Sequence, residues 1–199
     1  PLRDVRQWGY QRVVAKQSIL QFDAAPPPLA KHARTGCAST LAFEFSHGGH
    51  RLVVNCGGSG CAGGLMPVRL EQGLRATAAH STLVLDDANS TAVLINGAIG
   101  TGVSEVEVDR RTLTGDKGAS QKGGGATRLE ASHNGYEARY GLTHRRILIL
   151  RDDGTELRGE DLLVPGGKKG KKGKVGFAIR FHLGAGIEVR LSDDGQGAG

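Results

Sequence analysis

A thiol, a carboxamide and an imidazole stand at the ends of three short segments in which apolar and polar residues alternate. Cys37 precedes the first segment, Asn55 lies near the end of the second, and His80 precedes the third. If these segments are neighbouring strands whose ends meet, the thiolate and the imidazole can bind a zinc-type metal, with the amide oxygen as a weaker ligand. Polar residues are common at strand ends, so the spacing alone favours a simpler interpretation, in which His80 only satisfies a turn.

Alternation with a period of two runs through most of the sequence and predicts β-strands. The alternating segments are Ser39–Ser46, His50–Cys56, Ser81–Asp87, Val103–Asp109, Thr127–Ser132, Arg145–Arg151, Phe177–Leu183 and Ile187–Leu191. Glycine-rich turns at Gly48–Gly49, Asp153–Gly154 and Gly184–Gly186 predict hairpins between successive strands. No segment keeps a helical period with caps, so we expect little helix.

We therefore predict an all-β protein, an antiparallel β-sandwich with glycine-rich loops, formed by one domain over residues 1–199. The segments Asp23–Cys37, Gly57–Gly73 and Thr114–Ala126 lack the alternation and are expected to be loops. The last predicted strand is followed by Ser192–Gly199, where another hairpin would normally begin. The sandwich is accordingly expected to be partial, without its last strands and with an exposed edge.

The net charge of +6 is unevenly distributed, because five lysines lie within Gly166–Gly176. Such a cluster can attract a polyanion, but no aromatic side chains are interleaved to stack on bases, so nucleic acid is not the favoured partner. A flexible, solvated loop of lysine and glycine is the simpler interpretation. No stretch approaches the roughly 18 apolar residues of a membrane helix, so a membrane partner is not expected.

The three cysteines do not form a closed disulfide framework, since their number is odd. Cys56 and Cys61 can pair in an oxidising compartment, but nothing in the sequence requires it. The sequence begins without a methionine and without the apolar core of a signal peptide, so we expect any targeting signal to lie outside it. The redox compartment therefore stays open.

Six motifs of the sequence, taken in order, resemble one protein family. They are "WGYQRVVA", "CASTLAFEFSHGGHRLVVNCG", "RATAAHSTLVLDD", "HNGYEARYGLTHRRILIL", "LRGEDLL" and "FAIRFHL". Together they are similar to the C-terminal β-sandwich domain of the heparinase II/III-like polysaccharide lyases, in the bacterial branch that carries an Asn-Cys-Gly triplet. Each motif alone is unspecific, but the ordered set spans nearly the whole chain.

The resemblance implies that an upstream (α/α) toroid domain of the same polypeptide completes the active cleft and supplies its tyrosine. It places the catalytic histidine of the sandwich on His80 and an arginine that can face a uronate carboxylate on Arg75, for which a surface arginine is an equal alternative. It places zinc-binding positions on Cys37, Asn55 and His80, where Cys37 and Asn55 depart from the family's histidine and aspartate. His32 is the candidate to replace a further missing histidine and is counted with the catalytic residues.

The function that the resemblance implies is β-elimination on a uronate-containing, glycosaminoglycan-like acidic polysaccharide. The C5 proton of a uronate is acidic only when the adjacent carboxylate is neutralised; a base then removes the proton and an acid protonates the departing C4 oxygen. Zinc is the implied cofactor, and a periplasmic or secreted location follows from the family alone. Two alternatives stay open: a non-catalytic carbohydrate-associated or scaffold module, and a polyanion-binding module that uses Lys168–Lys174. His182 is expected to be solvated.

Overall fold

The computed structural model describes residues 9–28, 35–58, 66–114, 124–167, 170 and 173–198 of the 199-residue chain. Strands account for 43% of the residues and helices for 9%. The predicted fold class is confirmed: the protein is mostly β, with antiparallel sheets and little helix. None of the helices in these ranges is long and apolar enough to cross a membrane.

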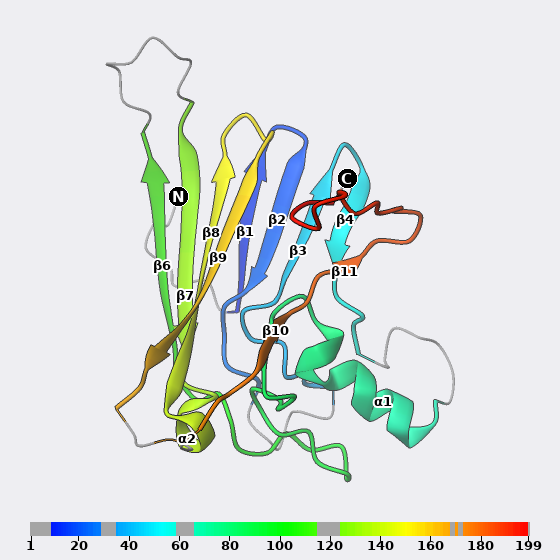
Figure 1. Ribbon diagram of the computed structural model, residues 1–199, viewed down its shortest axis with the longest axis vertical. Helices are drawn as coiled ribbons and strands as arrows, with labels where there is room; N and C mark the ends of the chain where they lie inside the picture. The colour runs from blue at the N-terminus through cyan, green and yellow to red at the C-terminus, as the bar shows by residue number, and fades with distance from the viewer. Residues whose placement is uncertain are drawn as a thin grey trace.

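The strands form two large antiparallel sheets and a two-stranded ribbon (Figure 1). The first sheet has the order β1 (Tyr10–Ala15), β2 (Ser18–Asp23), β3 (Phe43–His47), β4 (His50–Val54) and β11 (His182–Leu183). The second has the order β6 (Val106–Leu113), β7 (Ala126–His133), β8 (Leu142–Arg151) and β9 (Leu157–Pro165). The ribbon pairs β10 (Phe177–Ile179) with β5 (Leu83–Leu85). The helices are α1 (Val68–Arg75), the 3-10 helix η3 (Thr77–Ala79) and α2 (Glu137–Tyr140).

The hydrophobic core lies between the two large sheets. Every second residue of β1 is buried, and the same alternation runs along most of β8. The largest core side chains are Leu20, Phe22 and Phe43 from the first sheet and Leu129, Leu148 and Leu150 from the second. Each of these strands turns one face to the core and the other away from it. The period-two pattern of the sequence therefore indicates which residues face the core of the sandwich.

The segment Gly57–Gly73, predicted to be a loop, contains most of helix α1 among its described residues, so that prediction is wrong. The helix begins directly after Pro67 and ends at Arg75. It is eight residues long and includes Gly73, so its helical period is too short to stand out in the sequence. Helices α1 and η3 carry the chain to His80, and the error therefore concerns the approach to the predicted site.

The predicted strand Phe177–Leu183 is divided between two sheets. Its first part is β10, which pairs with β5, and its last part is β11, which pairs with β4. The change of partner occurs at Arg180, whose backbone N–H donates to the carbonyl of Thr82 at 3.0 Å. The segment Ile187–Leu191 forms no strand, so the hairpin predicted there is wrong. Continuous alternation does not reveal such a division, and the apolar residues of this segment, Phe177, Ile179 and Leu183, are exposed in the described structure and not buried.

Candidate active site

A cavity of about 590 Å³ opens where the ends of several first-sheet strands meet the residue that follows η3. Its wall includes Cys37, Asn55 and His80, the three residues that the sequence places at strand ends. Tyr10 at the start of β1 and Asp23 at the end of β2 line the same cavity. The structure therefore brings the predicted thiol, carboxamide and imidazole to one place.

His80 is a buried residue and not the half-exposed strand cap that the spacing alone favours, since only 3% of it is exposed. Its Nδ1 lies 2.8 Å from the carbonyl oxygen of Ala76. A carbonyl only accepts, so Nδ1 carries the proton and Nε2 keeps a lone pair. Burial lowers the pKa of His80, although the bond to Ala76 opposes this in part. The result is a neutral imidazole with a fixed tautomer in the cavity wall.

Ser81, the next residue, is bonded through all of its polar groups. Its backbone N–H donates to Oδ1 of Asn55 at 2.8 Å, and its hydroxyl donates to the carbonyl of Val54 at 2.7 Å. The same hydroxyl accepts from the backbone N–H of His182 at 2.9 Å, and the Ser81 carbonyl accepts from Arg146 at 2.8 Å. The backbone that leaves His80 is therefore fixed by residues of β8 and β11 and by the end of β4.

The described residues do not fit the predicted zinc ion. Asn55 holds its side-chain oxygen against Ser81, and its nitrogen has no lone pair to offer. In the part of the chain that the structure describes, no group of three or more histidine, cysteine, aspartate or glutamate side chains is arranged to hold a metal. Cys37 and His80 alone leave a tetrahedral site two protein ligands short. Zinc thus remains a prediction that only the family resemblance supports.

Arg75 is neither on the surface nor in the cavity wall. Only 1% of the residue is exposed. Its Nε donates to the carbonyl of Gly36 and its NH1 to the carbonyl of Gly97, both at 2.6 Å. In this geometry Arg75 braces the segment that leads to Cys37, and it would have to release these carbonyls before it could contact a uronate. The other predicted catalytic residue, His32, lies outside the described residues.

His182, which was expected to be solvated, is half-buried and only partly solvated, and its ring makes two contacts within the protein. Its Nε2 lies 3.0 Å from the carbonyl oxygen of Ala78, and its Nδ1 lies 3.8 Å from Sγ of Cys56. It packs against the turn that precedes His80 and belongs to the support of the site. In the lysine-rich segment, Lys168, Lys169, Lys171 and Lys172 lie outside the described residues.

Asp23 and Tyr10 are cavity residues that the sequence reasoning missed. Burial raises the pKa of Asp23 to about 6, although a hydrogen bond from the Ser39 hydroxyl at 2.7 Å opposes the shift. The pKa of Tyr10 is raised to about 12, mainly by the negative charge of Asp23 and next by burial of the phenol. Asp23 is the first residue of the segment Asp23–Cys37, and a carboxylate at the point where an apolar strand ends was the signal available in the sequence.

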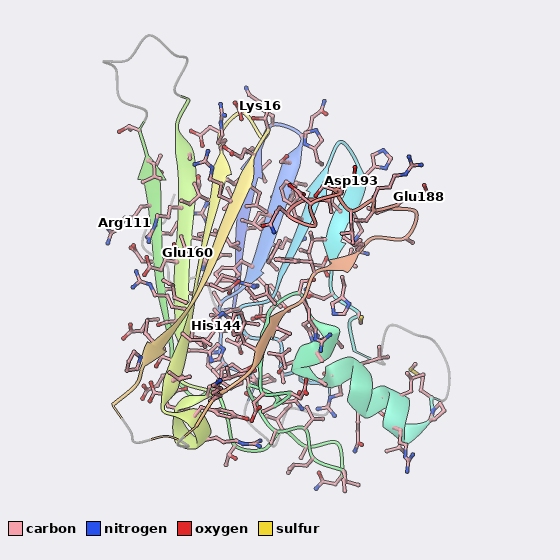
Figure 2. The ribbon with its side chains drawn as sticks, in the orientation of Figure 1. Lys16, Arg111, His144, Glu160, Glu188 and Asp193 are labelled. Atoms are coloured by element: carbon pink, nitrogen blue, oxygen red, sulfur yellow. The ribbon has the colours of Figure 1, made fainter. Side chains whose placement is uncertain are left out.

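A buried polar network supports the cavity from the second sheet. Arg146 on β8 forms a bidentate ion pair with Asp161 on β9, with both pairs of atoms 2.8 Å apart. Asp161 is also 2.6 Å from Nε2 of His144, which lies in the interior of the molecule (Figure 2). His133 on β7 contacts His144 at 3.3 Å. The sequence motif contained these histidines, but nothing in it showed that they face inward together.

Comparison with known proteins gives three findings. The family model described as heparinase II/III-like, C-terminal, matches residues 1–198. FtsZ-localized protein C of Caulobacter vibrioides is 29% identical over 201 residues, which cover 94% of this chain and 32% of that protein. A heparan sulfate lyase HepC mutant from Pedobacter heparinus has a similar fold, with a TM-score of 0.51 and 18% identity over 79% of this chain. The chain spans about a third of the curated relative and 21% of the lyase.

Proposed function

The chain belongs to the heparinase II/III-like C-terminal family, and from this we propose that it is the β-sandwich part of a polysaccharide lyase. The substrate is a uronate-containing, glycosaminoglycan-like acidic polysaccharide, cleaved by β-elimination. An upstream (α/α) toroid domain of the same polypeptide is the partner that completes the cleft. The observation that carries the proposal is His80, a neutral imidazole with its Nδ1 anchored on a carbonyl in the wall of a large cavity.

The reaction needs a group that accepts a proton and a group that returns one. With Nδ1–H held by Ala76, the lone pair of His80 Nε2 is the available base, and the resulting imidazolium must lose this proton to solvent before the next turnover. Asp23, whose pKa burial raises to about 6, is the other cavity group that can exchange a proton near neutral pH. We assign no step to zinc, because the described residues do not fit it.

The uronate carboxylate must be neutralised before its C5 proton can leave. Arg75 was the predicted partner, but its guanidinium donates to the carbonyls of Gly36 and Gly97. We therefore assign the neutralising group to the upstream domain, together with the tyrosine that protonates the leaving oxygen. Under this proposal the sandwich contributes His80 and the shape of one wall, and catalysis requires both domains.

A non-catalytic carbohydrate-associated or scaffold module is the second candidate. It is supported by Asn55, which has a neutral side chain at the position where the family has a carboxylate and uses its oxygen to hold Ser81. The curated relative, FtsZ-localized protein C, is named for where it is found and not for a reaction. In this function the cavity would bind a glycan without cleaving it.

The test is a lyase assay on the full-length polypeptide, with a panel of uronate polymers and detection of unsaturated uronate by its absorbance. Replacing His80 by alanine is expected to lower turnover by about a hundredfold or more, because it removes the proton-transfer group. The matched control is His50→Ala, an exposed histidine of the β3–β4 hairpin, which should retain full turnover. Activity that survives His80→Ala would refute the assignment, and glycan binding without any product would favour the non-catalytic module.

A further inference from the structure

We propose that Arg146 is a positioning residue for His80, acting through the carbonyl of Ser81, and that Asp161, His144 and His133 hold Arg146 in place for this role. The inference deepens the proposed function, because it concerns the residue that we assign to proton transfer. Neither Arg146 nor its three supporting residues lines the cavity. They influence it from the opposite sheet.

Arg146 connects two walls of the cavity. Its NH1 donates to the carbonyls of Ser81 and Leu41, each at 2.8 Å. Ser81 directly follows His80, and Leu41 lies between Thr40 and Ala42, which line the cavity. The guanidinium carbon also lies 5.4 Å from the centre of the Phe43 ring. One side chain thus contributes to holding the backbone at two separate segments beside the site.

Leu41 shows why such a restraint is needed. Its φ of 65° lies in the left-handed region, which is a strained conformation for a residue other than glycine. Two hydrogen bonds hold this residue, one from Arg146 to its carbonyl and one from its backbone N–H to the carbonyl of Asp23 at 2.8 Å. Leu41 lies between two residues that line the cavity, so the bond from Arg146 helps to hold this part of the wall.

The hydrogen bonds behind Arg146 all run in one direction. The backbone N–H of Gly135 donates to Nδ1 of His133 at 3.0 Å, so the proton of His133 is on Nε2. That Nε2–H points at Nδ1 of His144, and the remaining proton of His144 is then on Nε2, which donates to Asp161. Both tautomers are therefore determined, and the chain ends on the carboxylate that holds Arg146.

The protonation states of these groups agree with this series of hydrogen bonds. Burial lowers the pKa of His133 far below its usual value, and the charges of His144 and Arg146 add to the shift. Burial also lowers the pKa of His144, against the opposing bond to Asp161. Burial alone would raise the pKa of Asp161, but hydrogen bonds from His144 and Arg146 lower it to about 2. Arg146 is consequently held by a charged carboxylate, which two neutral histidines support.

Stability alone does not account for this arrangement. A buried ion pair costs so much desolvation that apolar residues of the same volume often serve as well. Arg146, of which 1% is exposed, does more than pair with Asp161, since its third nitrogen is directed at the two carbonyls beside the cavity. A guanidinium can make a bidentate pair and still donate elsewhere, whereas a lysine ammonium cannot do so with the same geometry. This geometric difference provides the test.

The experiment compares Arg146→Lys with Arg145→Lys by 15N NMR of the histidine side chains, which shows which ring nitrogen carries the proton. Arg145 is the matched control, because it is the neighbouring arginine of β8 and pairs with Glu130. In the wild type and in Arg145→Lys we expect His80 to be the Nδ1–H tautomer alone. In Arg146→Lys the Ser81 carbonyl loses its shortest donor and keeps only the backbone N–H of Phe43 at 3.4 Å, so the hold on the His80 backbone is weakened. A fraction of the Nε2–H form that unrestrained imidazole prefers should then appear.

A His80 signal that stays fixed in the Nδ1–H form in Arg146→Lys would overturn the proposal. If this variant does not fold, Asp161→Asn serves instead, because it keeps the side-chain size and removes the charge that holds Arg146. In the full-length lyase, Arg146→Lys is expected to lower kcat by about ten- to a hundredfold with little change in KM. If the wild type cleaves no polymer, the proposed function fails, but the His80 tautomer still decides whether Arg146 positions it.

Discussion

Acidification should destabilise this protein more steeply than its exposed surface charges can explain. His133, His144 and His80 are each held neutral by burial, which lowers the pKa of each below the ordinary value of 6.5. The unfolded chain therefore binds these protons at a higher pH than the folded protein does. A group with a depressed histidine pKa stabilises the fold above about pH 6.5, and this contribution decreases as the pH falls.

The size of the effect follows from counting protons. Each histidine that stays neutral in the folded state costs about 1.4 kcal/mol for every pH unit below its unfolded pKa. Asp23 works in the opposite direction, because its pKa is raised from 3.8 to about 6 and the folded state binds its proton first. Between about pH 6 and pH 3.8, Asp23 therefore offsets the loss of stability that about one histidine causes. The net loss between about pH 7 and about pH 5.5 is then about 1–3 kcal/mol, a large part of a typical folding free energy.

The measurement is urea unfolding at several pH values across this range, for the wild type and for His133→Gln. Removing this histidine should flatten the slope by up to about 1.4 kcal/mol per pH unit. The exposed His50 is the control, since His50→Gln should leave the slope unchanged. A stability that stays constant or rises as the pH falls from about 7 to about 5.5 would refute the reasoning, because it would mean that the three histidines are already charged in the fold.

Two further predictions concern single residues. Asn55→Ala should lower the free energy of unfolding by about 1–3 kcal/mol, because it leaves the buried N–H of Ser81 without its acceptor. Urea unfolding measures this, with Asn96→Ala as the control, since Asn96 is exposed and its loss should change little. Equal effects of the two substitutions would contradict the prediction. Gly154→Ala should cost at least about 2 kcal/mol, because its φ is 73° and the added methyl would lie 2.3 Å from the carbonyl oxygen of Ala15; an unchanged melting temperature would show that the turn can move.

Strands such as β1 and β8 could be predicted from the sequence because each buries one face against the core between the two large sheets. Alternation in the segment that includes β8 gave its inward and outward residues, and the Gly48–Gly49 turn gave the β3–β4 hairpin. The prediction of one strand over Phe177–Leu183 went wrong although the alternation was present, because the strands that pair with this segment are distant in the sequence. The change from β5 to β4 near Arg180 depends on where those strands lie, and alternation carries no information about that.

The site could be predicted in part for a related reason. His80, Cys37 and Asn55 were singled out by residue type and by the order of the motifs, and all three line the cavity. Their hydrogen bonds could not be foreseen, since whether Asn55 faces a ligand or the backbone of Ser81 depends on distances of a few ångströms. The hydrogen bonds of Arg75 could not be foreseen either, because an arginine is expected at the surface unless the carbonyls that surround it are known.

The link from Arg146 to Ser81 limits how this cavity can be changed by design or by evolution. Its lining residues cannot be grafted onto another scaffold as a set of loops, because their backbone is held from a strand in the facing layer. Sequence drift in β8 or β9 would alter the cavity without touching one of its lining residues. A comparison of homologues that considers only the lining would then overlook the changes that matter.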